Sequence, residues 1–409
     1  GGATGGAGGT GAGPVTDPEA VQPAFFGMSA GSPSDPSAWP TVPIGALGHP
    51  GLLAWGAVEP ARDQFVWDYY DAQIDKAVAH HVPAYVTFGW TPKWALADTS
   101  SCTGNLCTAP PDNLQDWTFF VSEIVNRYRG KVAVWEIWNE ANGPSFYTGT
   151  QAQLVALAAA AYPIVHHVDP KAIVAAPSTS GSLQSVETWL AGYLAAGGAA
   201  YADACTAHGY PAQQTPLPFP ETESSNGAIL TRLRGVRQVC DQNGLMGKPL
   251  YMSEGSWGQN EHLTDPDAQV AFLARYELLQ AGARDELSLA GSYWYAWGHG
   301  TGAQYGSIAN QDGSATPAGA AYGQVFRWVV GKRLAPCAAA ADGTTITCAL
   351  TDAADAGYRG LVVWTTAASG TFTVTAPYTK RRTLDGATHA LAKGPLAIGP
   401  APFLLEGHE

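Results

Sequence analysis

Two glutamates lie at the ends of short apolar segments of this chain. Glu140 directly follows the run KVAVWEIWN (131–139), and Glu254 closes the run PLYMSE (249–254). Most glutamates are solvated surface groups, but a nearly uncharged apolar run is typical of a strand that is buried on both faces. In a barrel of parallel strands, the working residues lie at the carboxyl ends of the strands. The two positions are therefore candidates for chemistry.

Two carboxyl groups that face one another across a cleft are what cleavage of a glycosidic bond requires. One of them must be protonated, which needs a pKa raised by an apolar wall or a neighbouring charge. We predict that Glu140, beside Trp138 and Asn139, is this acid/base, and that Glu254 is the ionised nucleophile. Glu136 lies four residues before Glu140, inside the strand predicted over 131–139. We expect its side chain to point into the barrel and to be hydrogen-bonded in a structural role.

Short apolar runs alternate with amphipathic stretches over most of the chain, which predicts parallel strands alternating with helices. The expected strands are 24–29, 51–56, 83–90, 131–139, 172–177, 203–210, 249–254 and 291–297. The expected helices are 67–81, 112–130, 152–168, 226–240, 265–282 and, closing the barrel, 317–331. We therefore predict an α/β fold, a (β/α)₈ TIM barrel. An open doubly wound sheet is the alternative, but no G-x-G-x-x-G follows a strand.

Three regions of the chain differ in composition. Residues 1–22 are rich in Gly and Ala and indicate a flexible tail at the start of a mature or trimmed chain. Residues 23–330 form the predicted catalytic barrel. Residues 331–409 contain short alternating segments bounded by turns, which predicts a small C-terminal antiparallel β-sandwich. We expect this accessory domain to support the barrel rather than to bind carbohydrate.

Further residues are candidates for binding a substrate. His208 and Tyr210 end the sixth predicted strand, where a tyrosine hydroxyl can hold the nucleophile ionised. Trp294 and Trp297 end the eighth and are candidates for an aromatic floor under a sugar ring. The loops contribute other candidates for the cleft wall: Trp90, Lys93, Trp94, Trp55 and Trp257. Ordinary packing is the alternative for each of these aromatic residues.

The composition restricts the class of partner. The net charge is −13, with 21 Lys and Arg against 34 Asp and Glu, so the chain lacks the basic face that a nucleic-acid binder needs. The sequence contains no run of 18 uncharged apolar residues, so we expect no segment that spans a membrane. We find no H-E-x-x-H, phosphate loop, nucleotide fingerprint or G-x-S-x-G, and we expect neither a metal nor a cofactor. The 14 Trp suit packing, or stacking on a carbohydrate substrate.

The six cysteines fall into near pairs: Cys102 with Cys107, Cys337 with Cys348, and by elimination Cys205 with Cys240. None forms a C-x-x-C or another zinc-like spacing. An even count in close pairs suggests disulfides, although fifteen connectivities are possible for six cysteines. Disulfides indicate an oxidising compartment, so we expect a secreted or periplasmic protein. The sequence does not indicate an oligomeric state.

The motif W-x-x-W-N-E (135–140), with a glutamate closing the seventh strand, resembles clan A of the glycoside hydrolases. The stretch GAVEPARDQFVWDYYDAQIDKAVAHHVPAYVTFGWTPKWA, followed by WEIWNEAN, is similar to family 39, which includes β-xylosidases and α-iduronidases. The resemblance implies a retaining mechanism with Glu140 as acid/base, Glu254 as nucleophile and Asn139 on the 2-hydroxyl of the attacked sugar. His49 stands where we expect an Arg-containing stretch in relatives, which leaves the sugar unidentified.

Two other functions remain open on the sequence. The first is a barrel that binds glycans without cleaving them, which the presence of both carboxylates disfavours. The second is a transglycosidase that uses the same residues, with a sugar instead of water intercepting the intermediate. The linkage and the choice between exo and endo action depend on loop paths that the sequence does not give.

Overall fold

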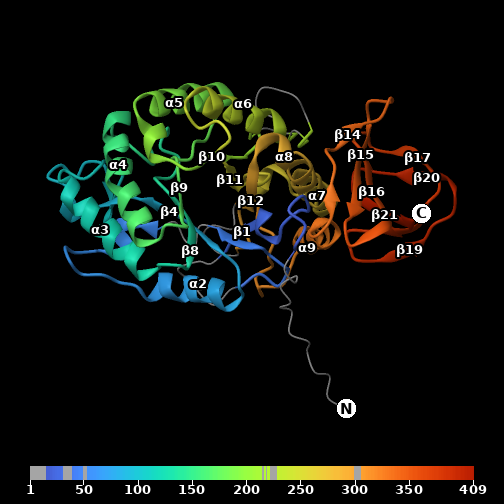
Figure 1. Ribbon diagram of the computed structural model, residues 1–409, viewed down its shortest axis with the longest axis horizontal. Coiled ribbons are helices and arrows are strands. Elements are labelled where there is room, and N and C mark those ends of the chain that lie inside the picture. Colours follow the sequence, from blue (N-terminus) through green and yellow to red (C-terminus); the bar gives the residue numbers. More distant parts are fainter. Residues whose placement is uncertain are drawn as a thin grey trace, which may run out of the picture.

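The computed structural model describes residues 15–30, 39–48, 53–213, 216–217, 219–221, 228–298 and 305–409. In this part of the chain, parallel strands form a ring with helices around it, and antiparallel strands lie at one end of the molecule (Figure 1). The barrel strands are β1 (Phe26–Ser29), β2 (Ala46–Gly48), β4 (Ala84–Gly89), β8 (Val132–Glu136), β9 (Ile173–Ala175), β10 (Cys205–His208), β11 (Leu250–Gly255) and β12 (Leu289–Trp294). The predicted fold class is confirmed.

The ring closes between β9 and β10. The hydrogen-bonded order is β10-β11-β12-β1-β2-β4-β8-β9, and Ala175 of β9 forms a parallel bridge with Ala204, the residue before β10. The Ala176 amide donates to the Ala204 carbonyl at 2.9 Å. The carboxyl ends of all these strands therefore meet at one mouth.

Helices form the outer layer of the barrel (Figure 1). They are α1 (Trp55–Val58), α2 (Asp68–Ala79), α3 (Leu114–Arg127), α4 (Gln151–Val168), α5 (Leu183–Ala195), α6 (Ile229–Gln242), α7 (Pro266–Gly282), α8 (Arg284–Leu287) and α9 (Pro317–Val329). Side chains cap several of them: Thr150 and Gln153 form a capping box at α4, and Asn113 accepts from the Gln115 amide at α3. Short strands β3 (Leu53–Ala54), β5 (Thr91–Pro92), β6 (Cys102–Thr103) and β7 (Leu106–Cys107) lie in the loops.

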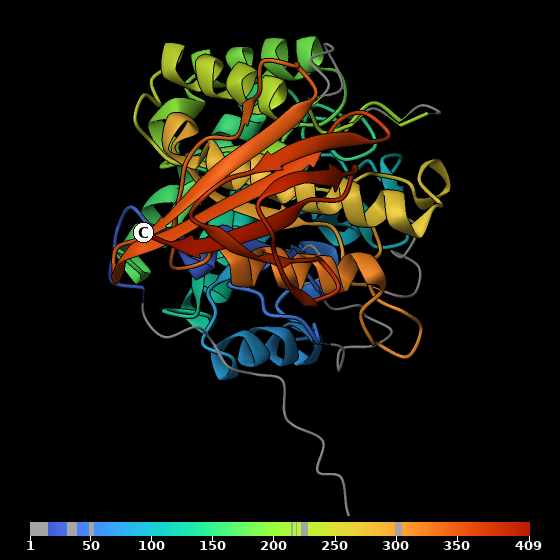
Figure 2. The ribbon, with the colours of Figure 1, turned by 90° about the vertical axis from the view of Figure 1, so that its right-hand side faces the viewer.

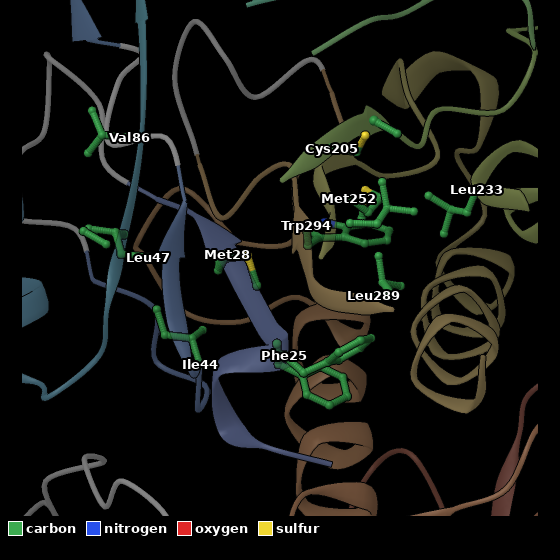
Figure 3. Close-up of a cluster of buried hydrophobic side chains, with 14 of the residues drawn as sticks. Phe25, Met28, Ile44, Leu47, Val86, Cys205, Leu233, Met252, Leu289 and Trp294 are labelled. Carbon is green, nitrogen blue, oxygen red and sulfur yellow. The ribbon is translucent and has the colours of Figure 1, made fainter. Parts of the chain in front are cut away.

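Side chains fill the inside of the barrel. Tyr85, Tyr251 and Tyr293 point inward from three strands, and their ring centroids lie 5.0 to 6.5 Å apart. A larger apolar layer lies between the strands and the helices, and Figure 3 shows part of it, including Met252 and Trp294. The interior is a packed core, so chemistry is confined to the mouth.

The second strand differs from the prediction. The expected strand 51–56 is wrong: its described part is β3, which pairs with the end of β4 outside the ring order, followed at once by α1. The ring position between β1 and β4 belongs to β2, whose three residues, Ala-Leu-Gly, are too few to give an apolar run. His49 directly follows β2 but lies outside the described residues.

The tail also differs from the prediction. Val21 is fully buried and bridges Val330 after α9, and Asp17 forms an ion pair of 2.6 Å with Arg333. Residues 15–22 are therefore packed on the protein, because an apolar side chain and an acidic one both find partners there. Residues 1–14 of the expected tail lie outside the described residues.

The C-terminal strands pair only in antiparallel fashion among the described residues. They are β13 (Arg333–Leu334), β14 (Ala338–Ala339), β15 (Thr345–Asp352), β16 (Asp355–Thr365), β17 (Gly370–Val374), β18 (Tyr378–Arg382), β19 (Thr388–Ala390), β20 (Gly394–Ile398) and β21 (Phe403–His408). β17 and β20 form a small second sheet beside the larger one, and Val363, Ile398 and Phe403 pack together. Figure 2 shows these strands in front of the barrel.

Three disulfides join the cysteines in the pairs suggested by their spacing: Cys102–Cys107, Cys205–Cys240 and Cys337–Cys348. The first closes the hairpin of β6 and β7, the second ties β10 to α6, and the third lies in the sandwich. None of the helices in the described part of the chain combines the length and the apolar character that a membrane crossing requires.

A further carboxyl group is buried where α7 packs on β12. Glu277 of α7 is fully buried, and its Oε2 accepts a hydrogen bond of 3.0 Å from the Ser292 hydroxyl of β12. Burial raises the pKa of Glu277 to about 8, although the hydrogen bond from Ser292 opposes this. The folded protein therefore holds this side chain protonated at neutral pH.

We predict that Glu277 makes stability fall as the pH rises from about 4.5 to 8. Over this range the folded protein binds the Glu277 proton more tightly than the unfolded chain, so each rise in pH favours unfolding. The Glu277→Gln variant lacks this proton and should gain on the order of 2 to 4 kcal/mol over the native protein at pH 8. Chemical denaturation at pH 5, 6.5 and 8 measures the difference. The exposed Glu286→Gln variant is the control, and parallel pH curves for the native protein and Glu277→Gln would contradict the prediction.

Candidate active site

Glu140 lies in a strained turn beyond the end of β8. The backbone angle φ is 80° at Trp138 and 42° at Glu140. Residues other than glycine rarely adopt such a left-handed conformation. The chain after β9 braces this turn: the Ser178 hydroxyl accepts from the Glu140 amide at 3.1 Å, and Asn142 and Ser180 exchange hydrogen bonds of 2.7 and 3.0 Å. The turn is therefore held from outside its own segment.

Glu254 lies within β11 at a break in strand pairing. Ala207 pairs with Met252, but the next residue, His208, pairs with Glu254, so one residue of β11 is skipped. Such a bulge re-aims a side chain. Glu254 is 8% exposed, and the Tyr210 hydroxyl donates to its Oε1 at 2.5 Å.

His208 lies between the two glutamates. Its Nδ1 lies 2.8 Å from Oε1 of Glu140, and its Nε2 lies 3.9 Å from Oε2 of Glu254. One ligand atom of each of the three side chains lies within 4.8 Å of the others. The structure thus brings both predicted carboxyl groups to one place.

These three side chains are also the one group of potential metal donors of this size among the described residues. Carboxylate and imidazole can both hold divalent metals. We assign no metal here: Nδ1 of His208 and Oε1 of Glu140 are engaged with each other at 2.8 Å.

The charges of the cluster shift every pKa in it. Burial works against a charged His208, but the charges of Glu254 and Glu140 and the hydrogen bond to Glu140 outweigh it and raise the pKa of His208 to about 9. Burial acts to raise the pKa of Glu140, yet the hydrogen bond and charge of His208 prevail and lower it, so the raised pKa expected for an acid/base from its apolar neighbours is wrong for Glu140 itself. Burial and the negative Glu140 raise the pKa of Glu254, against the opposing effects of His208 and Tyr210. The cluster therefore holds a proton on His208, between the carboxylates.

Glu136 lies below this cluster, at the end of β8. It is fully buried; its Oε2 accepts from the Tyr85 hydroxyl at 2.5 Å and its Oε1 accepts from the Ser178 amide at 3.2 Å. Burial raises the pKa of Glu136. Its position inside the barrel, with these partners, agrees with the structural role expected for it.

Asn139 is nearly fully buried in the same turn as Glu140. Its Oδ1 has no hydrogen-bond partner among the described residues. A buried polar atom without a partner is costly, so its presence beside Glu140 makes Asn139 a candidate for contact with a ligand.

The structure places three predicted tryptophans in the core. Trp55, Trp257 and Trp294 have no exposed surface, and their indole nitrogens donate to Glu59, Asn260 and the Gly306 carbonyl. Trp294 lies in the layer between strand and helices (Figure 3). None of the three is therefore available to stack on a sugar, and Trp297, at 1% exposed, offers little more.

Tyr295 takes the place that we had assigned to Trp294. Tyr293 points into the barrel, so the next residue of β12, Trp294, points outward and Tyr295 returns inward. Burial and the charges of Glu254 and Glu140 raise the pKa of Tyr295, so its hydroxyl is within the electrostatic influence of both carboxyl groups. Tyr305 lies beside Tyr210 with the ring centroids 6.2 Å apart. Neither tyrosine is marked in the sequence by a strand end or a motif.

The loop after β4 contributes one candidate to the mouth. Trp90 is half-buried, has a φ of 52°, and lies with its ring centroid 6.1 Å from that of Phe146, in the loop that follows Glu140. Trp94 instead donates to the Glu59 carbonyl and packs under Arg62. Lys93 is exposed, and no contact links it or Trp94 to either carboxyl group in the described part of the chain.

Comparison with solved structures finds the same architecture in glycoside hydrolases. A family 39 glycoside hydrolase from the gut symbiont Bacteroides cellulosilyticus WH2 aligns over 96% of this chain and 82% of its own, with a TM-score of 0.75 and 19% identity. A β-xylosidase of family 39 from Caulobacter crescentus aligns over 97% and 98%, with a TM-score of 0.68 and 16% identity. A family 44 xyloglucanase from Paenibacillus polymyxa aligns over 95% and 97%, with a TM-score of 0.61 and 13% identity.

The fold resembles that of family 39. The predicted resemblance is confirmed at this level, over both the barrel and the sandwich. No protein-family model and no curated protein matches the sequence. At identities below 20% the structural likeness establishes the fold, and the chemistry must be argued from the site.

We predict that His208 keeps its proton well above neutral pH. Its imidazole ¹⁵N signals, assigned by comparison with His208→Asn, should titrate with an apparent pKa of about 9. In Glu140→Gln the pKa should fall, because the hydrogen-bonded charge is lost. Glu286→Gln should leave it in place. An imidazole that is neutral at pH 7 in the native protein would contradict the electrostatics of the cluster.

Proposed function

We propose that this protein is a retaining glycoside hydrolase, with Glu140 as acid/base and Glu254 as nucleophile. The observation that carries the proposal is the convergence of both carboxyl groups on His208, with oxygens of the two within 4.8 Å. Retaining enzymes have carboxyl groups about 5–5.5 Å apart, whereas inverting enzymes need about 6.5–9.5 Å to admit a water. The short separation favours retention.

In the first step Glu254 attacks the anomeric carbon while Glu140 donates a proton to the glycosidic oxygen. The bond between the anomeric carbon and that oxygen breaks. The Tyr210 hydroxyl holds the attacking carboxylate in place through its 2.5 Å bond to Oε1. In the second step Glu140, now ionised, takes a proton from water, which attacks the anomeric carbon and releases Glu254. Asn139, Trp90 and Tyr295 are proposed to contact the sugar.

Glu140 needs a proton in the first step, and His208 supplies it. Before a sugar binds, the pair is charged, with the proton on His208 and the negative charge on Glu140. A bound sugar excludes water, and a drier site favours the neutral pair, in which the proton has crossed the 2.8 Å hydrogen bond to Glu140. His208 thus acts on the substrate through Glu140.

We expect Glu254→Ala to lower turnover by several orders of magnitude, because the covalent intermediate cannot form. A panel of aryl glycosides identifies a substrate, and NMR of the first product then gives its anomeric configuration.

Glu140→Ala should retain more activity on a substrate whose leaving group needs no proton than on an alkyl glycoside. Glu261→Ala, an exposed glutamate, is the control. Turnover by Glu254→Ala at the native rate, or an inverted product, would overturn the assignment. An added acceptor sugar reveals any transglycosylation.

We expect His208→Asn to lose activity at lower pH than the native enzyme. The native Glu140–His208 pair holds its proton until the pH nears 9, so activity should extend into mildly alkaline solution. With asparagine in its place, Glu140 must hold the proton alone, and the alkaline limb of kcat/KM should move down by at least about one pH unit. An unmoved alkaline limb would show that His208 has no part in protonating Glu140.

A further inference from the structure

Among the described residues of the connection from β10 to α6, Glu221 makes a contact with the sandwich. Glu221, near the far end of this connection, accepts a hydrogen bond of 2.7 Å at Oε1 from the indole of Trp364 in β16. Its Oε2 faces the Arg275 guanidinium of α7, 3.6 Å from Nη1. One group from the sandwich and one from a barrel helix thus meet at Glu221, beside Pro220, whose carbonyl accepts from the Ile229 amide of α6 at 3.2 Å.

Arg275 ties the same three parts of the molecule together. It is fully buried, and it donates to two sandwich carbonyls, Pro400 at 2.8 Å and Thr365 at 2.9 Å. Its guanidinium also lies 5.0 Å from the ring of Phe219 in the connection. α7 lies on the side of the barrel that faces the sandwich (Figure 1). A buried guanidinium needs an anionic partner, and Glu221 is the one that the described residues provide.

The near end of the connection begins at the reaction centre. Tyr210, which donates to Glu254, is the second residue after β10. Gln213 then accepts from the Gln259 amide at 2.9 Å, and Gln259 bridges Tyr305. Tyr210, Gln213, Gln259 and Tyr305 thus form one rim on the Glu254 side of the mouth, and Glu221 anchors the chain that continues from it.

We propose that Glu221 is a positioning residue through which the sandwich fixes the β10–α6 connection, and that this sets the affinity for sugar units beyond the attacked one. Tyr210 is held by its own bond to Glu254 and by the adjoining strand, so the chemical step does not depend on Glu221. Among the residues described between Gln213 and α6, Glu221 is the one with a hydrogen bond to the sandwich. The substrate part of this proposal rests on the proposed function.

The first test needs no activity. Hydrogen exchange followed by mass spectrometry compares the native protein with Glu221→Gln, which loses the charge facing Arg275, and with Trp364→Phe, which loses the indole donor but keeps an aromatic ring. We expect faster exchange in peptides covering 211–221 in both variants, with unchanged exchange in β8 and β11. Glu286→Gln, which breaks an exposed ion pair with Arg234, is the matched control. Unchanged exchange over 211–221 in both variants would overturn the link.

The second test uses a glycoside that the native enzyme cleaves. For an aryl glycoside of one sugar, Glu221→Gln should keep kcat and KM within about twofold, whereas for an oligosaccharide of the same sugar KM should rise about tenfold with kcat little changed. A loss of kcat on both substrates would mean a general structural role and would overturn the proposal, as would an unchanged KM for the oligosaccharide. If no glycoside is cleaved at all, the proposed function fails, and hydrogen exchange still decides whether the sandwich holds this connection.

Discussion

Three carboxyl groups lie close to one imidazole at the mouth of this barrel, and the local structure follows from that constraint. Like charges in a site with little water repel strongly, so each carboxyl group needs its own compensation. Glu136 receives hydrogen bonds from Tyr85 and a backbone amide, Glu140 receives the proton-bearing nitrogen of His208, and Glu254 receives the Tyr210 hydroxyl. His208 faces two of them at once, which is why its own pKa rises despite complete burial.

Bringing these groups together costs backbone regularity. Glu140 reaches the cluster from beyond the end of its strand through residues with positive φ, each worth about 1–3 kcal/mol of strain. Glu254 reaches it through a skipped residue in the pairing of β10 and β11. The Glu140 amide donates to Ser178 and the Ser180 amide donates to Asn142, so the loop after β9 stabilises a conformation of the strained turn that β8 alone would not keep.

The sequence predicted the parts of the site that follow from strand ends. Apolar runs marked β8, β10 and β11, and the polar residues after them proved to lie together. Trp294 was misplaced because the run GSYWYAW is apolar on both faces, so alternation gives no sign of which aromatic points inward. The second strand was missed because three residues, one of them glycine, carry too little pattern. The strand position of Glu254 opposite His208 depends on a register shift between β10 and β11, which leaves no mark in the residue order.

Glu277 and Glu254 show that the surroundings of a buried carboxyl group decide what it can do. Both are enclosed by the same barrel, and burial raises the pKa of each. Glu277 has one hydroxyl as its partner, so it is held as a neutral acid that serves packing alone. Glu254 lies within reach of an imidazolium and a phenol, which recover part of the hydration energy that an ionised group loses on burial. Under the proposed function, Glu254 attacks as a carboxylate, and poor hydration would leave that carboxylate basic and unshielded, as attack on carbon requires. His208 is thus the residue that makes burial and ionisation compatible in this site.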